Sequence, residues 1–141
     1  MSKIINQISI FISNTPGSLA ALSETLKACN VNMLAFNLSE NSEFGIVRII
    51  VKDPKKAVAA LEEKKLTVRA TEVIGVRIQD IPGAFLPAAE ALGNAGINIR
   101  YAYAFTLVGG DAVLFIRVDE PDKAISVLEK AGIRLESEAD L

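Results

Sequence analysis

Four short segments in the first half of the chain recur in the second half, in the same order and at nearly the same spacing. Three of the pairs are 66 residues apart and the last is 67 residues apart, so one residue has been inserted before it. The pairs are Pro16-Gly17 with Pro82-Gly83, Asn32 with Asn98, Val47 with Val113, and Pro54 with Pro121. Because four ordered matches at one spacing indicate an internal duplication, the sequence predicts two modules of one fold.

The duplication divides the 141 residues into two predicted domains, residues 1–70 and residues 71–141. Modules of about 70 residues lie near the lower limit for an independent hydrophobic core. Half of the residues are hydrophobic, which is a large share for modules of this size. We therefore expect the modules to share apolar surface with each other or with a second copy of the chain.

Each half shows the same order of strand and helix patterns. Apolar residues alternate over 8–12 and over 74–78, which is the period of a half-buried strand. Pro16 and Pro82 then stand where a helix can open, and Asn30 and Gly96 stand where it can end in the left-handed conformation. The later predicted elements are strands from 31 and 97, hairpin turns at 41–45 and 109–111, strands at 46–51 and 112–118, helices from 54 and 121, and last strands at 66–70 and 133–138.

The order β-α-β-β-α-β, found twice, is that of the ferredoxin-like α+β fold. Right-handed crossovers place both helices of such a module on one face of a four-stranded antiparallel sheet. The predicted strands around 33–38 and 112–118 are apolar on both faces, whereas a solvated face is polar. We therefore expect a second subunit to cover part of the helix-free face, and the chain to form a homodimer.

The Pro-Gly turn after the first strand, with Asn-Val-Asn-Met or Gly-Ile-Asn-Ile opening the second strand, resembles the ACT domain. The resemblance covers essentially the whole chain, in two copies. The chain is similar to free-standing tandem ACT proteins, because no length remains for a catalytic domain. It implies a regulatory module that binds a free amino acid or a similar metabolite. It also implies that modules join through their second strands into one eight-stranded sheet, with ligands at the seam.

The resemblance assigns ligand binding to the strand-to-helix corner and to the start of the second strand in each module. In the first module the matching positions are Asn14, Thr15, Pro16, Gly17, Ser18, Leu19, Asn32 and Met33. In the second module they are Asp80, Ile81, Pro82, Gly83, Ala84, Phe85, Asn98, Ile99 and Tyr101.

These residue types suit a zwitterionic ligand. Free N–H groups at a helix N-terminus favour the ligand's carboxylate, and glycine lets the ligand approach that backbone closely. Asn14 or Asp80 can accept a hydrogen bond from the ammonium group, and Asp80 does so with charge assistance. An asparagine contributed across the seam, Asn32 or Asn98, offers both a donor and an acceptor.

The two predicted sites are unequal. Asp80 carries a charge where the first module has the neutral Asn14, and Tyr101 and Tyr103 replace Ala35 and Asn37. We expect the corner at Asp80 and the strand at Asn98 to build the better site, for a side chain that can stack on an aromatic ring.

Structural explanations for the same residues stay open. The Pro-Gly turns can be tight strand-to-helix connections, and the asparagines can cap the preceding helix ends. Tyr101 and Tyr103 can be packing residues on an alternating strand. Cys29 is expected to be a small buried side chain. Glu40, Glu43 and Asp111 are expected to be solvated residues of the hairpin turns.

Composition argues against catalysis, metals and cofactors. The chain has no histidine and a single cysteine, so the commonest general base, the commonest metal ligand and an intrachain disulfide are all excluded. It carries no Walker loop, no nucleophile elbow and no dinucleotide fingerprint. Acylphosphatases share the topology but need an arginine in the loop after the first strand, and loops 13–18 and 79–84 contain neither arginine nor lysine. We therefore expect that the protein is not an enzyme, has no catalytic residues, and binds no metal and no cofactor.

The net charge of −2 is spread over interleaved acids and bases, so a nucleic-acid partner is not expected. No apolar run approaches the roughly 20 residues of a membrane span, and the first residues do not begin a signal peptide, so we expect a cytoplasmic protein with no membrane partner. The predicted function is a regulatory sensor of a free amino acid. The alternative is a docking subunit that binds and regulates a separate metabolic enzyme.

Overall fold

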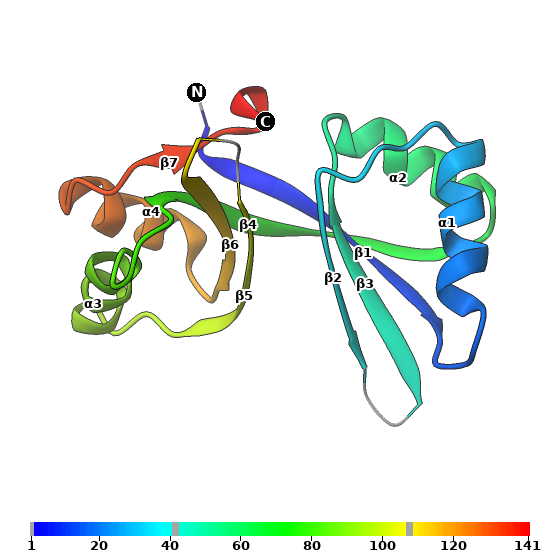
Figure 1. The fold of residues 1–141 in the computed structure, drawn as a ribbon, viewed down its shortest axis with the longest axis horizontal. Coiled ribbons are helices and arrows are strands. Elements are labelled where there is room, and N and C mark those ends of the chain that lie inside the picture. Colours follow the sequence, from blue (N-terminus) through cyan, green and yellow to red (C-terminus); the bar gives the residue numbers. More distant parts are fainter. Residues whose placement is uncertain (1, 41–42, 107–108) are drawn as a thin grey trace. The chain divides into compact units, whose positions relative to one another are not determined.

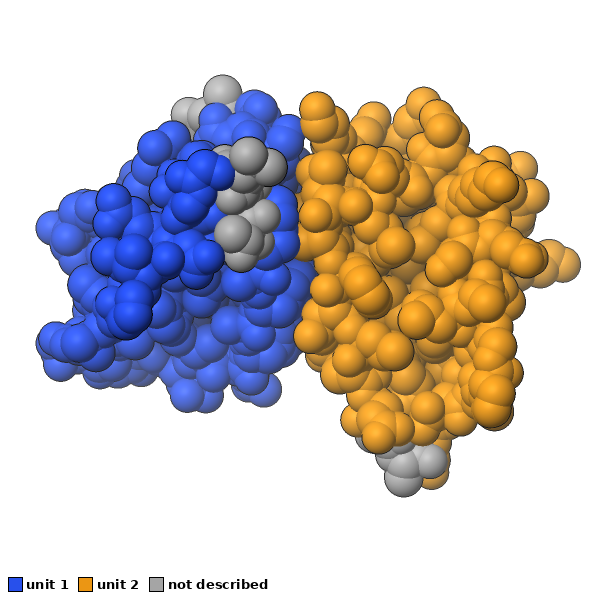
Figure 2. All heavy atoms as spheres, viewed as in Figure 1, with its two compact units in different colours: residues 1–5, 72–141 blue, residues 6–71 orange. Residues whose placement is uncertain are grey.

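The structure is a computed structural model that describes residues 2–40, 43–106 and 109–141. The chain forms two compact units, which Figure 2 colours separately. Residues 6–71 form the first-repeat unit, and residues 1–5 together with 72–141 form the second-repeat unit. Each unit contains one copy of the repeat, and each is described by itself below. The predicted hairpin turns at 41–45 and 109–111 adjoin or include residues outside the described ranges.

The first-repeat unit has the predicted order of strands and helices. Its sheet runs in the order β2-β3-β1-β4, and β1 and β2 both pair with β3 in antiparallel register. The elements are β1 (Ile4–Ser13), α1 (Ser18–Ala28), β2 (Ala35–Glu40), β3 (Phe44–Ile50), α2 (Pro54–Glu63) and the first residues of β4 (Thr67–Gln79). As predicted, α2 begins at Pro54, and the side chain of Asp53 caps it.

One hydrophobic core joins both helices of this unit to one face of its sheet (Figure 1). Leu22 and Leu26 of α1 and Leu61 of α2 are buried against strand residues such as Ile10 and Ile49. Leu22 and Leu26 are four residues apart, about one helical turn, so their spacing marks the buried face of α1.

The second-repeat unit repeats this arrangement. Its strands follow the order β5-β6-β4, and β7 pairs with β4 on the other side. The remaining elements are α3 (Leu86–Asn94), β5 (Ile99–Thr106), β6 (Asp111–Val118), α4 (Pro121–Lys130), β7 (Leu135–Glu136) and a short 3₁₀ turn, η1 (Glu138–Asp140). Ala88 and Leu92 of α3, with Ala124 and Leu128 of α4, form its core against the sheet. The ferredoxin-like α+β prediction is confirmed for both repeats.

The boundary between the repeats lies inside a strand. The sequence predicted one strand ending at residue 70 and another around 74–78, but β4 runs without a break from Thr67 to Gln79. The first five residues, which the sequence assigned to the first module, belong to the second-repeat unit. Ile5 is buried there, and its Cδ1 lies only 2.9 Å from where a Cβ on Gly75 would sit. Gly75 therefore leaves room for the N-terminal strand.

Two predicted element boundaries are wrong in the second repeat. Pro82 does not open a helix, because residues 82–85 form a turn and α3 begins at Leu86, with Pro87 in its first turn. Pro16 also lies in a turn before its helix, since α1 begins at Ser18. The last strand spans only Leu135–Glu136 instead of 133–138. Pro87 can occupy the first turn of α3 without losing a hydrogen bond, so the helix starts one residue before this second proline.

Asp111 is not a solvated turn residue. It forms an ion pair with Arg77 at 3.0 Å, and Arg77 forms a second ion pair at 3.0 Å with the buried Glu136. The hydrogen bonds that Arg77 donates to Glu136, and to a lesser extent to Asp111, hold the pKa of Arg77 above its ordinary value. The two ion pairs of Arg77 connect β4 to β6 and to β7, which is a strand of only two residues.

The exposed apolar surface lies on only one of the two strands that the sequence predicted, and on the other face of the sheet. Val113 and Phe115 on β6 are buried within the chain, so they need no second subunit to cover them. Two large apolar side chains are exposed on β2, where Phe36 is 49% and Leu38 is 47% exposed, and Met33, Ile81 and Leu86 are exposed outside this strand. They stand opposite Ile49 and Val47, and directly paired residues share a face. The exposed strip therefore lies on the helix-bearing face of an edge strand.

Helices long and apolar enough to cross a membrane are absent from the described part of the chain.

Candidate functional site

The first corner, residues 14–18, joins β1 to α1 and is held by its own hydroxyl groups. The Oγ1 of Thr15 lies 2.8 Å from the Oγ of Ser18, and the Ser18 amide donates to the Thr15 carbonyl at 3.2 Å. Gly17 has a φ of 88°, in the left-handed region, and directly precedes α1. A residue with a Cβ is disfavoured there. The glycine is therefore a requirement of the turn, whether or not a ligand binds.

The second corner, residues 80–85, also contains a glycine in the left-handed conformation. Gly83 has a φ of 79°, and the amide of Leu86 donates to its carbonyl at 3.1 Å. The Asp80 amide donates to the Gly110 carbonyl at 2.7 Å, which anchors the start of the corner to the neighbouring hairpin. Ile81 is 58% exposed. Both corners are therefore ordered turns with exposed tips.

Neither corner is plugged by the described residues. A Cβ placed on Gly17 or Gly83 would meet no described atom within 4 Å. Across the ranges that the structure describes, no side chain caps the N-terminus of α1 or of α3. The first N–H groups of a helix lack partners within the helix and carry its positive dipole end. The start of α1 can therefore accept an anionic group such as a carboxylate, whereas the start of α3 keeps fewer donors, because the Leu86 amide donates to Gly83 and Pro87 has no N–H.

The polar residues at the two corners differ in their partners. Asn14 donates its side-chain amide to the Oε2 of Glu40 at 2.7 Å, so Glu40 is not simply solvated. The Asn14 side-chain oxygen remains an acceptor. The Asp80 side chain forms no hydrogen bond or ion pair with any residue that the structure describes. Asp80 is thus the stronger acceptor for an ammonium group.

Within one unit, the corner and the start of the second strand do not meet. The 11 residues of α1 separate the first corner from Asn32 and Met33, which is about 16 Å at the rise of an α-helix. The nine residues of α3 separate the second corner from Asn98 and Ile99 in the same way. A site that contains both segments would need two modules. Asn32 and Asn98 are exposed, so they are accessible to such a neighbour.

Asn32 and Asn98 do not cap the helices that precede them. The end of α1 is closed by backbone hydrogen bonds from Asn30 to Lys27 at 3.0 Å and from Val31 to Leu26 at 2.9 Å. Gly96 and Ile97 close α3 in the same way. Asn30 and Gly96 have φ values of 57° and 73°, as predicted for left-handed helix ends.

Several predicted site residues are packing residues. Leu19 is half-buried against the first core, and Phe85 and Ile99 are half-buried against the second. Their apolar side chains account for these positions without a ligand. Pro16, Pro82 and Ala84 shape the corners and offer no polar side chain.

A bulge in β5 decides where Tyr101 lies. The register shifts by one residue between Ile99, opposite Val118, and Tyr101, opposite Arg117. Ile99 therefore faces the helices, while Tyr101 and Tyr103 face the other side of the sheet. The ring of Tyr103 lies 5.6 Å from that of Phe115. Tyr103 is thus a packing residue, and Tyr101 stays half-buried on the helix-free face.

A hollow of about 220 Å³ that was not predicted from the sequence lies at the end of α1, where the β3–α2 connection approaches the start of β2. Lys52, Asp53 and Lys56 line it together with Asn30, Asn32 and the half-buried Cys29. Cys29 was expected to be buried. A signal was present in the sequence, because Lys52 stands where the second repeat has Asp119. Clusters of Cys, Asp and Glu placed to share a metal ion are absent from the residues that the structure describes.

The chain matches the family described as an ACT domain pair over residues 3–141. No curated protein matches it. A solved structure of protein BT0572 from Bacteroides thetaiotaomicron is 36% identical, with a TM-score of 0.91, and the match covers 98% of this chain and 95% of that one.

Solved structures of more distant proteins share the fold. The ligand-free regulatory subunit of aspartate kinase from Thermus thermophilus is 17% identical, with a TM-score of 0.62, over 90% of this chain and 92% of that one. The corresponding subunit from Thermus flavus is 14% identical, with a TM-score of 0.58, over 92% and 97%. The repeat, the two ferredoxin-like units and the family match agree, and this chain belongs to the ACT domain pair family.

Proposed function

We propose that this ACT domain pair is a regulatory sensor that binds a free amino acid and catalyses no reaction. The observation that carries the proposal is the pair of open corners. Each joins a left-handed glycine to a helix N-terminus without a side-chain cap in the described structure, and each places Asn14 or Asp80 beside it. Such a corner offers backbone donors to a carboxylate and a side-chain acceptor to an ammonium group.

The ligand would lie at a seam between two ACT modules. Asn32 or Asn98 from the neighbouring module would complete the site, because the helix in between keeps these residues away from the corner of their own module. The second corner is the stronger candidate, since Asp80 is charged and has no partner among the described residues. The first corner is weaker, because the amide of Asn14 already donates to Glu40.

A screen of the twenty amino acids by differential scanning fluorimetry tests the proposal. A ligand at about a hundred times its Kd should stabilise the protein by roughly 2.7 kcal/mol. Calorimetry on the amino acid that responds should show a loss of about tenfold or more in affinity for Asp80→Ala, because a charge-assisted hydrogen bond is removed. Asn14→Ala should weaken binding less.

Asp122→Ala is the matched control, because Asp122 is an exposed acid on α4, outside both corners. It should leave both the thermal shift and the affinity unchanged. If Asp80→Ala binds as tightly as the parent chain, the assignment of the second corner is wrong.

A second candidate is a docking subunit that regulates a separate enzyme. The exposed Phe36 and Leu38 on the edge strand β2 favour it, because apolar side chains on an open edge suit a protein partner. We also propose that the chain forms a homodimer in which this strip on β2 contacts a second copy. No thermal response to any amino acid, together with co-purification of a larger enzyme, would favour docking over direct sensing.

A further inference from the structure

The hollow beside Asn30 lies entirely within the first-repeat unit and is separate from both corners. It has a volume of about 220 Å³ and an apolar floor made by Val31, Val51 and Ala57. A hollow of this size and lining suits a small molecule with an apolar part. We refer to it as the Asn30 pocket.

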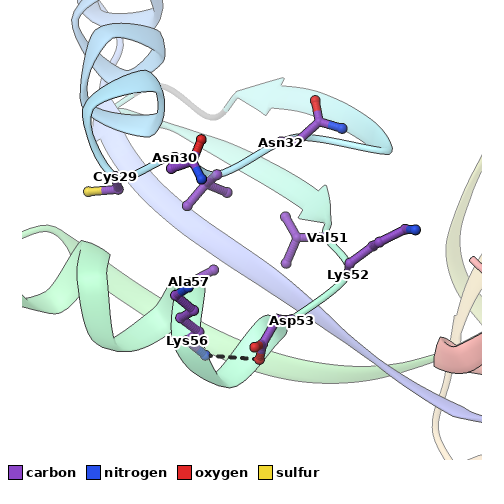
Figure 3. A pocket seen from close by; sticks show the side chains of 9 residues that line it. Cys29, Asn30, Asn32, Val51, Lys52, Asp53, Lys56 and Ala57 are labelled. Atoms are coloured by element: carbon purple, nitrogen blue, oxygen red, sulfur yellow. Dashed lines mark hydrogen bonds between the residues drawn. The ribbon is translucent and has the colours of Figure 1, made fainter.

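The rim of the Asn30 pocket is polar and comes from two connections. Asn30 and Asn32 belong to the link between α1 and β2, and they lie across the hollow from Asp53 and Lys56 at the start of α2 (Figure 3). Lys52 extends from the rim beside Val51. Amide groups that face a lysine across an apolar floor can hold a polar group while the floor holds its carbon skeleton.

The charges at the rim favour an anion. The carboxylate of Asp53 accepts from the backbone amide of Lys56 at 3.3 Å and so caps α2. The ammonium groups of Lys52 and Lys56 have no hydrogen bond or ion pair with the residues that the structure describes. Two cations therefore stand at the rim, with Lys52 extending outward from it (Figure 3), against one carboxylate that is engaged with the helix.

The second repeat shows what the same place looks like when its charges are neutralised. Asp119 stands at the position of Lys52 and forms an ion pair with Arg100 at 2.7 Å. Lys123, at the position of Lys56, lies 3.9 Å from Glu120. Gly96 replaces Asn30. The unbalanced positive charge is therefore a property of the first repeat and not of the shared fold.

We propose that the Asn30 pocket is an additional binding site for a small carboxylate that carries a short apolar chain. The carboxylate would pair with Lys56 and Lys52, Asn30 and Asn32 would donate from the opposite rim, and the chain would lie on Val31 and Val51. The site does not depend on the proposed amino-acid site, with which it shares only Asn32.

Titration of the full-length ¹⁵N-labelled chain with sodium propionate tests the proposal by NMR. Sodium phosphate serves as an anion without an apolar part, and propylammonium chloride as a cation of similar size. Propionate should shift the amide signals of 30–32 and 51–57 in a saturable way and more strongly than phosphate. Propylammonium should leave them in place.

The double variant Lys52→Gln and Lys56→Gln should weaken propionate binding about five- to tenfold, which is the range for two exposed ion pairs. Lys123→Gln, at the matching position of the second repeat, should leave it unchanged, as should Asp80→Ala. The proposal would be overturned if propionate shifted the amide signals of the double variant as much as those of the parent chain. It would also be overturned if the signals around Asn98 and Glu120 shifted as much as those of 30–32 and 51–57. The absence of saturable shifts at residues 30–32 and 51–57 would overturn it as well. The effect of Asp80→Ala on amino-acid binding tests the proposed function, and its outcome is independent of the propionate result.

Discussion

At the scale of single residues, glycines with similar surroundings have opposite roles. Gly83 has a φ of 79°, whereas Gly93 lies inside the helix α3. A Cβ at either position would meet no described atom within 4 Å. The two positions therefore differ in backbone conformation and not in the space available for a Cβ. This makes them a matched pair for testing whether the second corner needs its glycine for the turn itself.

Gly83→Ala should destabilise the protein by about 1 kcal/mol, because an L-residue is strained at positive φ. Gly93→Ala should stabilise it by about 0.5–1 kcal/mol, because alanine is the better helix former. Chemical denaturation that follows the second-repeat unit measures both changes. Equal effects of the same sign in the two variants would contradict the conformational argument.

At the scale of elements, β1 and β4 are the strands that both units share. Each contributes residues to the first-repeat unit and to the second-repeat unit. The sequence of β4 explains its length, since residues 67–79 contain no proline and no Asn-Gly or Asp-Gly pair that would turn the chain. The only glycine, Gly75, is where Ile5 approaches the strand. A repeat boundary drawn from similarity alone therefore falls inside a continuous strand.

Ile5→Ala should loosen the second-repeat unit, although residue 5 stands next to the first-repeat unit in the sequence. Ile5 is 1% exposed and Ile8 is fully buried in the first core, so each truncation should cost about 2–5 kcal/mol. Hydrogen exchange should become faster in β6 for Ile5→Ala and in β3 for Ile8→Ala. The same exchange pattern in both variants would show that residues 1–5 stabilise the chain in some other way.

At the scale of the whole molecule, the two repeats differ in what their edge strands expose. Phe36 and Leu38 of β2 correspond to Ala102 and Ala104 of β5, 66 residues later. All four face the helix-bearing side of their sheets, but only the first pair is large. If β2 joins two copies of the chain, as we propose, the large side chains provide the apolar contact.

Phe36→Asp should raise the dissociation constant of the homodimer at least about tenfold, because burial of one phenylalanine contributes roughly 1.5–3 kcal/mol. Sedimentation over a range of protein concentrations measures the change. Ala102→Asp introduces the same charge at the matching position of β5 and should leave the dimer intact. A parent chain that is monomeric at every concentration would exclude the dimer.

The sequence by itself determined the features that repeat or that depend on neighbouring residues. The 66-residue spacing predicted two copies of one fold, and Asn30 and Gly96 predicted the helix ends. The start of α2 followed from its Asp-Pro pair. Each of these depends on local periodicity, backbone conformation or capping, which are set within a few residues.

The tertiary structure alone decided which distant segments meet. It placed Ile5 against Gly75, joined Asn14 to Glu40, paired Asp111 with Arg77, and brought Lys56 across from Asn30. These relations depend on strand register and on how two connections approach each other in space. Two repeats with the same local pattern can differ in both, because a single bulge or one reversed charge changes a site without changing the fold.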